Sequence, residues 1–269
     1  METADIIGLL VPLTFLIMWA VETIRPARQY PPIRGWGLMG LVFLVVMASI
    51  STVVPLLIPV EWLARHRLFD GTGLGVAGGA VVGYIVVSFV NYLWHRSTHT
   101  FPLLWRMFHQ LHHGPQRLDI PGSVVFHPFD VTMYVSISTL TSTLILGLNP
   151  LAAAFTGYIA AFYSLFQHWN IRTPQWLGYL IQRPEAHGVH HRRGLHGYNY
   201  GDLPIWDILF GTFRNPKMFN GEVGFDTGSA QRMGAMLVFA DVNESEYGAD
   251  SRGVSRNNEP VVGRAPSVA

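Results

Sequence analysis

Cysteine is absent from this sequence of 269 residues, and charged residues are scarce. Without cysteine the chain can form neither a disulfide nor an iron–sulfur cluster or cysteine-ligated zinc site. Only 13% of the residues are charged, and the net charge of +1 includes no basic stripe of the kind that binds nucleic acid. We therefore expect no nucleic-acid partner, and a metal site would have to use other ligands.

Hydrophobic residues make up 49% of the chain and form long runs. About 20 consecutive apolar residues are needed to cross the hydrocarbon core of a membrane. Apolar segments are predicted at about residues 6–24, 36–59, 74–94, 131–148 and 151–166. The last two are short and are separated by the turn residues 147–150, so we expect them to form a hairpin in the membrane. The sequence predicts an all-α fold, an integral membrane helical bundle of about four to five transmembrane segments.

Histidines at helical spacing are the main chemical signal. Eight of them form three boxes, which are His95 and His99, then His109, His112 and His113, then His187, His190 and His191. At spacings of three and four residues, imidazoles share one helix face and several can bind one metal ion. Imidazole suits iron, zinc, copper and nickel, so the ligand type does not choose the metal. The number of imidazoles indicates either two metal ions or one overbuilt site.

The order of the apolar segments places all three boxes on one side of the membrane. The third segment ends at His95, the fourth begins after the second box, and the fifth returns before the last box. The linker that contains Arg25, Arg28 and Arg34 falls on the same side. Because cytoplasmic loops carry an excess of Lys and Arg, we expect a multi-pass protein with its histidine-rich helical cap in the cytoplasm.

The boxes and a later motif resemble a known family. The motifs are His-Arg-Ser-Thr-His at 95–99, His-Gln-Leu-His-His at 109–113, His-Gly-Val-His-His at 187–191, Asn-Tyr-Gly at 199–201 and Trp-Asp-Ile-Leu-Phe-Gly-Thr at 206–212. Their order and spacing are similar to those of the fatty acid hydroxylase / sterol desaturase superfamily. The resemblance covers about residues 95–213, and the earlier helices match by hydropathy alone.

The resemblance implies a non-haem di-iron centre that hydroxylates or desaturates a lipid with dioxygen and external electrons. The implied ligands of the two iron ions are the eight box histidines and His168. Relatives often have a further histidine one turn later, where this sequence has Arg172. No Gly-x-Gly-x-x-Gly fingerprint opens a predicted helix, so we expect a separate electron donor, such as a ferredoxin, a b-type cytochrome with its reductase, or a reduced pterin.

Three more residues are candidates for roles beside the metal. His127 resembles a family His-Pro-acid element and is expected near the ligands or the substrate channel. Asp207 is placed to orient a ligand imidazole, or else to cap a helix or pair with Arg214. Asn199 belongs to a turn-forming sequence that needs no function to explain it. We expect His196 at the surface or behind the ligands rather than as a ligand.

The predicted domain organisation has three parts. Residues 1–72 form N-terminal transmembrane helices, residues 73–242 a fatty acid hydroxylase-like catalytic domain, and residues 243–269 a disordered polar tail. Two other functions compete with a lipid oxygenase. A membrane metal-binding or transport protein would need ionisable residues inside the spans, whose centres lack charge. A zinc-dependent lipid hydrolase would need a base, and the boxes contain no carboxylate.

Overall fold

The computed structural model describes residues 3–242, and all regular elements within this range are helices. One isolated β-bridge joins Arg192 to Val223. The all-α prediction is therefore confirmed. The tail predicted at 243–269 lies outside the described residues.

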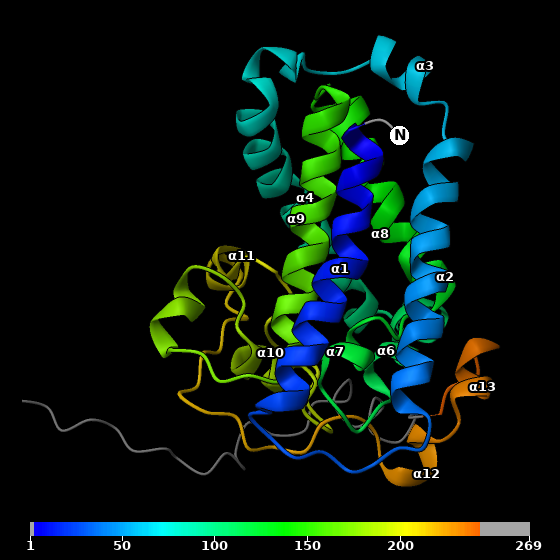
Figure 1. The fold of residues 1–269 in the computed structure, drawn as a ribbon, viewed down its shortest axis with the longest axis vertical. Helices are drawn as coiled ribbons and strands as arrows, with labels where there is room; N and C mark the ends of the chain where they lie inside the picture. Colours follow the sequence, from blue (N-terminus) through cyan, green and yellow to red (C-terminus); the bar gives the residue numbers. More distant parts are fainter. Residues whose placement is uncertain (1–2, 243–269) are drawn as a thin grey trace, which may run out of the picture.

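A stem of long apolar helices forms one end of the molecule (Figure 1). Helices α1 (Thr3–Ile24), α2 (Trp36–Leu57) and α4 (Gly75–Thr100), the last preceded by the 3-10 turn η1 (Gly71–Leu74), are long and apolar enough to cross a membrane. Only 11% of the apolar window of α2 is buried inside the protein, so most of its side chains are available to lipid. The chain is a membrane protein.

The predicted hairpin completes the stem. Helix α8 (Pro128–Leu140) continues through a π-helical turn, η3 (Thr141–Ile145), and α9 (Pro150–His168) returns. The side chain of Asn149 accepts a hydrogen bond from the amide of Ala152 at 2.8 Å and caps α9, whose first residue is proline. Helix α9 packs against both α1 and α4.

Two glycines of α4 permit the close approach of α9. A Cβ atom built on Gly79 would lie 2.8 Å from the Cβ of Ala152, and one built on Gly83 would collide with the hydroxyl of Thr156. Small residues at such crossings let two backbones approach within a membrane. The contact fixes the relative position of two helices that carry histidines at their ends.

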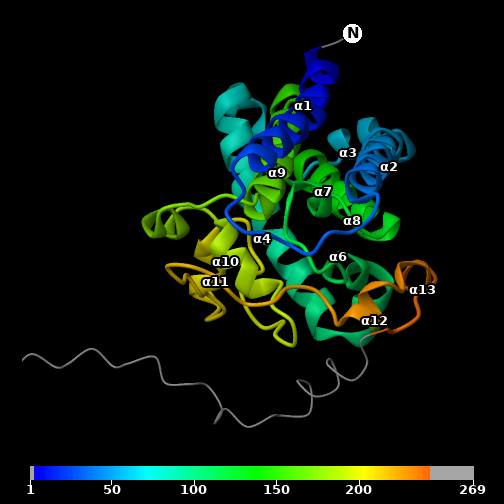
Figure 2. The ribbon, with the colours of Figure 1, turned by 60° about the horizontal axis from the view of Figure 1, so that its bottom comes forward.

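Short helices form a cap at the other end of the stem (Figure 2). They are α5 (Pro102–Leu104), η2 (Trp105–His109), α6 (Gln110–His113), α7 (Ile120–Ser123), η4 (Gln175–Tyr179), α10 (Pro184–His190), α11 (Pro204–Leu209), α12 (Thr227–Ala230) and α13 (Met233–Leu237). The linker between α1 and α2 lies at this end, and α3 (Val60–Arg65) lies at the opposite end (Figure 1).

Glu22 joins the stem to the cap. This residue of the last turn of α1 is 5% exposed, and its carboxyl group accepts hydrogen bonds from the amide of Ile120 at 2.9 Å and from the amide of Asn170 at 3.0 Å. Ile120 begins α7, and Asn170 follows the end of α9. The carboxyl group therefore fixes three segments to one another.

Candidate metal centre

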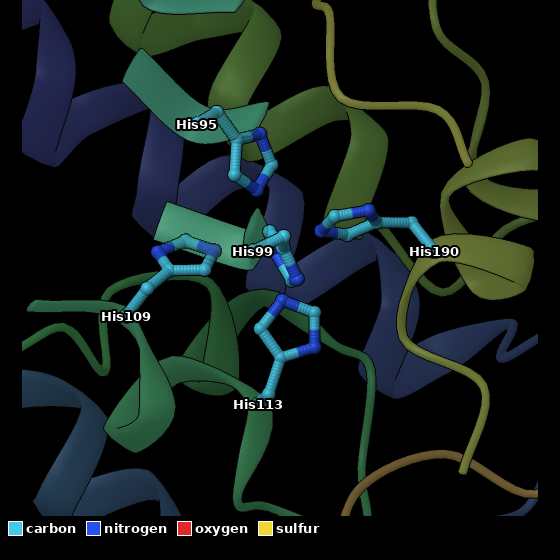
Figure 3. Close-up of side chains that lie close together, drawn as sticks. All are labelled: His95, His99, His109, His113 and His190. Carbon is cyan, nitrogen blue, oxygen red and sulfur yellow. The ribbon is translucent and has the colours of Figure 1, made fainter. Parts of the chain in front are cut away.

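Nine buried histidines gather where the stem meets the cap, in two groups that could each hold a metal ion. The first histidine group consists of His95, His99, His109, His113 and His190, and the second of His112, His168, His187 and His191. Within each group one nitrogen of every ring lies within 4.8 Å of the others. Figure 3 shows the five rings of the first group directed toward a common centre.

Helix geometry explains why the second and third boxes each serve both groups, whereas the first box serves only one. Residues four apart share a helix face, so His109 and His113 enter the first group, as do His95 and His99 at the end of α4. His112 points instead into the second group. The last box is divided in the opposite way, because His187 and His191, four residues apart, enter the second group and His190 enters the first. The rings of His113 and His191 stack at 4.1 Å, so the two groups are neighbours.

Hydrogen bonds fix the tautomers of three histidines in the first group. The Nδ1–H of His95 donates to the carbonyl of Tyr200 at 2.7 Å, and the Nδ1–H of His190 donates to the carbonyl of Tyr198 at 2.8 Å. The Nδ1–H of His109 donates to the carboxylate of Asp130 at 2.7 Å. In each neutral ring Nε2 is then left as a lone pair. These three Nε2 atoms are buried without a hydrogen-bond partner, as expected of atoms that bind a metal ion.

Nitrogen atoms converge even more closely in the second group. The Nε2 of His168 lies 3.0 Å from Nε2 of His112 and 3.1 Å from Nε2 of His187, which is 3.1 Å from Nε2 of His191. The Nδ1–H of His168 donates to the carbonyl of Ser164 at 2.6 Å, so its Nε2 is a lone pair. One lone pair facing several nitrogens at this distance is stabilised by a shared cation. The donor set therefore fits a metal ion.

Burial keeps several imidazoles of the cap uncharged. Removal from water, followed by repulsion from neighbouring imidazoles, holds the pKa of His113, His187 and His191 well below the usual 6.5. The same burial lowers the pKa of His190, although its bond to Tyr198 opposes the shift. Neutral imidazole is the form that binds metals, so these rings need not lose a proton to do so at neutral pH.

The profile of the fatty acid hydroxylase family matches residues 80–212, which contain all nine histidines of the two groups. This region of the chain belongs to the fatty acid hydroxylase family. The family predicted from the boxes is confirmed.

Several curated relatives of this chain have names that describe enzymes acting on lipids or long-chain aldehydes. An ornithine lipid hydroxylase of Rhizobium tropici is 32% identical over 179 residues, which are 64% of this chain and 53% of the relative. A sphinganine C4-monooxygenase of Arabidopsis thaliana is 26% identical over 49% of this chain and 53% of the relative. A very-long-chain aldehyde decarbonylase of rice, Oryza sativa, is 29% identical over 49% of this chain and 53% of the relative.

The chain spans about half the length of these curated relatives. No solved structure matches it.

Asp130 is a candidate functional residue that the sequence motifs did not predict. Its side chain is fully buried, and besides His109 it accepts a hydrogen bond from the indole of Trp94 at 3.1 Å. It is the acidic residue of the His-Pro-acid element at 127–130, and the motif alone does not show which of its polar side chains contacts a histidine of the groups. The carboxylate that contacts a histidine of the first group is therefore Asp130.

The structure places the other candidate residues around the histidine groups. The carboxylate of Asp207 accepts from the amides of Tyr200 and Gly201 at 2.9 and 2.8 Å and from the hydroxyl of Thr212 at 2.7 Å. It thus holds the loop whose carbonyl at Tyr200 receives His95. The amide group of Asn199 donates to the carbonyls of Ala186 and Arg214, both at 2.8 Å, and ties α10 to the same loop.

His127 and His196 differ in their relation to the groups. His127 caps α8, since its Nδ1 accepts from the amide of Phe129 at 3.2 Å and its Nε2–H donates to the carbonyl of Leu237 at 3.3 Å. His196 is 7% exposed, and its ring lies 5.8 Å from that of His99 and 5.1 Å from that of Trp105. It therefore lies behind the first group rather than at the surface. Arg172 is exposed.

Proposed function

We propose that this hydroxylase-family protein is a membrane-bound non-haem di-iron oxygenase that hydroxylates or desaturates a lipid with dioxygen. The observation that carries the proposal is the pair of adjacent, buried, all-imidazole groups at the end of an apolar stem. An uncharged nitrogen donor set suits a redox-active transition metal. A position next to the membrane suits a substrate dissolved in the bilayer.

The nine histidines would hold the two iron ions. His95, His99, His109, His113 and His190 would bind one, and His112, His168, His187 and His191 the other. Iron bound there would supply the activation of dioxygen that an unactivated C–H bond requires. The protein would contribute fixed lone pairs, neutral rings and a buried site from which bulk water is excluded.

The membrane orientation and the electron supply are also part of the proposal. The linker that contains Arg25, Arg28 and Arg34 lies at the cap end, which favours a multi-pass protein with its histidines facing the cytoplasm. The chain has no cysteine for an iron–sulfur cluster. Electrons would come from a separate ferredoxin, or from a b-type cytochrome with its reductase.

Metal analysis combined with lipid profiling tests the proposal. The full chain, purified in detergent, should contain about two irons, and cells that express it should accumulate a lipid changed by one oxygen atom or two hydrogen atoms. The His187→Ala variant should lose iron and product. His66→Ala should retain both, because His66 is exposed and directly follows α3, the helix at the opposite end of the stem (Figure 1). One firmly bound zinc ion and no oxidised lipid would instead identify a hydrolase or a metal carrier.

A further inference from the structure

Helix α11 lies beside the stem, level with the middle of α1 (Figure 1). The indole of Trp206 in α11 donates to the hydroxyl of Ser88 in α4 at 3.0 Å. At a rise of about 1.5 Å per residue, Ser88 lies about 20 Å along α4 from its first residue, Gly75. The exposed ion pair of Arg67 and Asp70 precedes Gly75 and marks the far end of the span. Because the hydrocarbon core of a membrane is about 30 Å thick, lipid still surrounds the stem at the level of α11.

The outward side of α11 is apolar. Ile205, Ile208 and Leu209 are each at least 45% exposed. The charged residue within this helix, Asp207, is fully buried and points to the loop at Tyr200. In water the three exposed side chains would remain hydrated at a cost in free energy, whereas among acyl chains they would not. The helix therefore has the surface of an element that contacts lipid.

This apolar side of α11 continues the lipid-facing surface of α4. Val81, Ile85 and Phe89 follow one another at spacings of four residues and share a helix face. Val81 and Ile85 are exposed, whereas Phe89 is half-buried. The ring of Phe89 lies 4.8 Å from that of Trp206 and 6.4 Å from that of Phe210. Helix α11 thus covers one turn of a face whose preceding turns are available to lipid.

The 3-10 helix η4 extends the apolar surface. Trp176, Tyr179 and Leu180 are each at least 60% exposed. The side-chain amides of Gln175 and Asn215 each donate to the backbone carbonyl of the other residue at 2.9 Å, which ties η4 to the segment after α11. Trp and Tyr are enriched where the hydrocarbon core meets the lipid headgroups. The composition of η4 therefore suits that boundary.

We propose that η4 and α11 are embedded in the leaflet nearest to the histidine groups, with α11 among the acyl chains and η4 at the headgroup boundary. The surface that contacts lipid, the η4–α11 face, consists of Trp176, Tyr179, Leu180, Ile205, Ile208 and Leu209. Its continuity with the exposed face of α4 identifies lipid as its partner. The inference requires neither metal nor turnover, so it stands apart from the proposed oxygenase function.

The buried side of α11 connects the η4–α11 face to the first histidine group. The carboxylate of Asp207 accepts from the amides of Tyr200 and Gly201, and the carbonyl of Tyr200 accepts from Nδ1–H of His95 at 2.7 Å. A helix anchored among acyl chains therefore fixes the depth of the first histidine group relative to the bilayer.

Single spin labels measure the surroundings of each position, because the chain has no native cysteine. Leu209→Cys reports on α11 and Trp176→Cys on η4. Ile85→Cys on α4 is the reference for lipid, and Gln231→Cys is the reference for water, since Gln231 is exposed and directly follows α12 at the end of the cap (Figure 1). The labelled full chains are reconstituted in phosphatidylcholine vesicles. Electron paramagnetic resonance then gives the ratio of label collisions with oxygen to those with a water-soluble nickel chelate.

The expected ratios follow from the solubility of the two probes. Oxygen dissolves in hydrocarbon, whereas a polar nickel chelate is excluded from it. We expect the ratio at Leu209 to approach that at Ile85 and to be at least about tenfold higher than that at Gln231. The ratio at Trp176 should lie between those at Leu209 and Gln231. Ile205→Cys repeats the measurement on α11 if Leu209→Cys does not fold.

Two kinds of result would overturn the proposal. One is a ratio at Leu209 or Trp176 equal to that at Gln231, which would place the face in water. The other is a label at Leu209 shielded from both oxygen and nickel, as expected beneath a second copy of the chain or another protein. Iron content is measured on the same preparations. Labels that face lipid on a protein without iron would contradict the oxygenase function alone.

Discussion

The Nδ1–H of His109 donates to Oδ2 of Asp130 at 2.7 Å, and both side chains are buried. The two residues are 21 positions apart, on different helices of the cap and the stem. A carboxylate in this position fixes the orientation of the imidazole and increases the basicity of its other nitrogen. Asp130 therefore acts on the first histidine group through His109.

Replacement of Asp130 by asparagine should weaken metal binding. Asp130 accepts from both His109 and Trp94, whereas an asparagine side chain has one acceptor oxygen and presents an NH2 group to the other donor. We expect metal affinity to fall about 10- to 100-fold, measured by competition with a chelator. Asp226→Asn is the matched control. Unchanged affinity in Asp130→Asn would show that the hydrogen bond does not contribute to metal binding.

His112 and His113 are adjacent but serve different groups, which predicts different effects on metal content. His112→Ala leaves three imidazoles in the second group, and His113→Ala leaves four in the first. Because firm sites use about three or four protein ligands, His112→Ala should lose more iron than His113→Ala. Iron per chain and Mössbauer spectra measure the difference. Equal losses would contradict the assignment of the two residues to separate groups.

The stability of the metal-free protein should fall steeply in acid. The pKa values of His113, His187, His190 and His191 are lowered in the folded state, so the unfolded chain binds more protons below its ordinary histidine pKa of about 6.5. Stability is then fully present above about pH 6.5 and is lost as the pH falls below it. Thermal unfolding between pH 7.5 and 5 tests this.

Bound metal should make the stability of the protein less dependent on pH, because histidines that bind an ion resist protonation until the ion is displaced. The same thermal measurement on iron-loaded protein provides the comparison. If the metal-free and loaded proteins lose stability in parallel, the imidazoles whose pKa values are lowered are not the ligands.

The contact between α4 and α9 makes Gly83 sensitive to substitution. In Gly83→Ala the new methyl group would collide with the hydroxyl of Thr156 and lie 2.8 Å from Leu148. We expect a loss of about 1–3 kcal/mol in the free energy of unfolding. Gly157→Ala is the control, because a Cβ atom there meets nothing within 4 Å. Similar stability of the two variants in detergent would show that α9 does not pack closely at Gly83.

Local patterns predicted the features that depend on neighbouring residues. Hydropathy located the stem helices, and the turn at Asn149 and Pro150 marked the start of α9. Box spacing predicted that imidazoles would share helix faces. These features could be predicted because a helix repeats every 3.6 residues and because apolar length is visible in one sequence.

Tertiary packing decided what the sequence could not show. Whether His112 joins the group of His113 or that of His168 depends on how α6 approaches α9. The distance between these two helices cannot be read from the spacing of residues within either of them. The burial of His196 behind His99 and the contact of Asp130 with His109 likewise arise between distant segments. The π-helical turn at Trp105–His109, which carries the first histidine of its box, has no evident sequence signal.

The bonds of Glu22 give the first helix a role beyond holding the protein in a membrane. Its carboxyl group receives the amide of Asn170, two residues after His168, together with the amide that opens α7. A chain shortened to start at residue 73 would leave both amides without their acceptor inside the protein. Helix α1 therefore supports the second proposed metal position. A change in its tilt within the bilayer would displace the segment that carries His168.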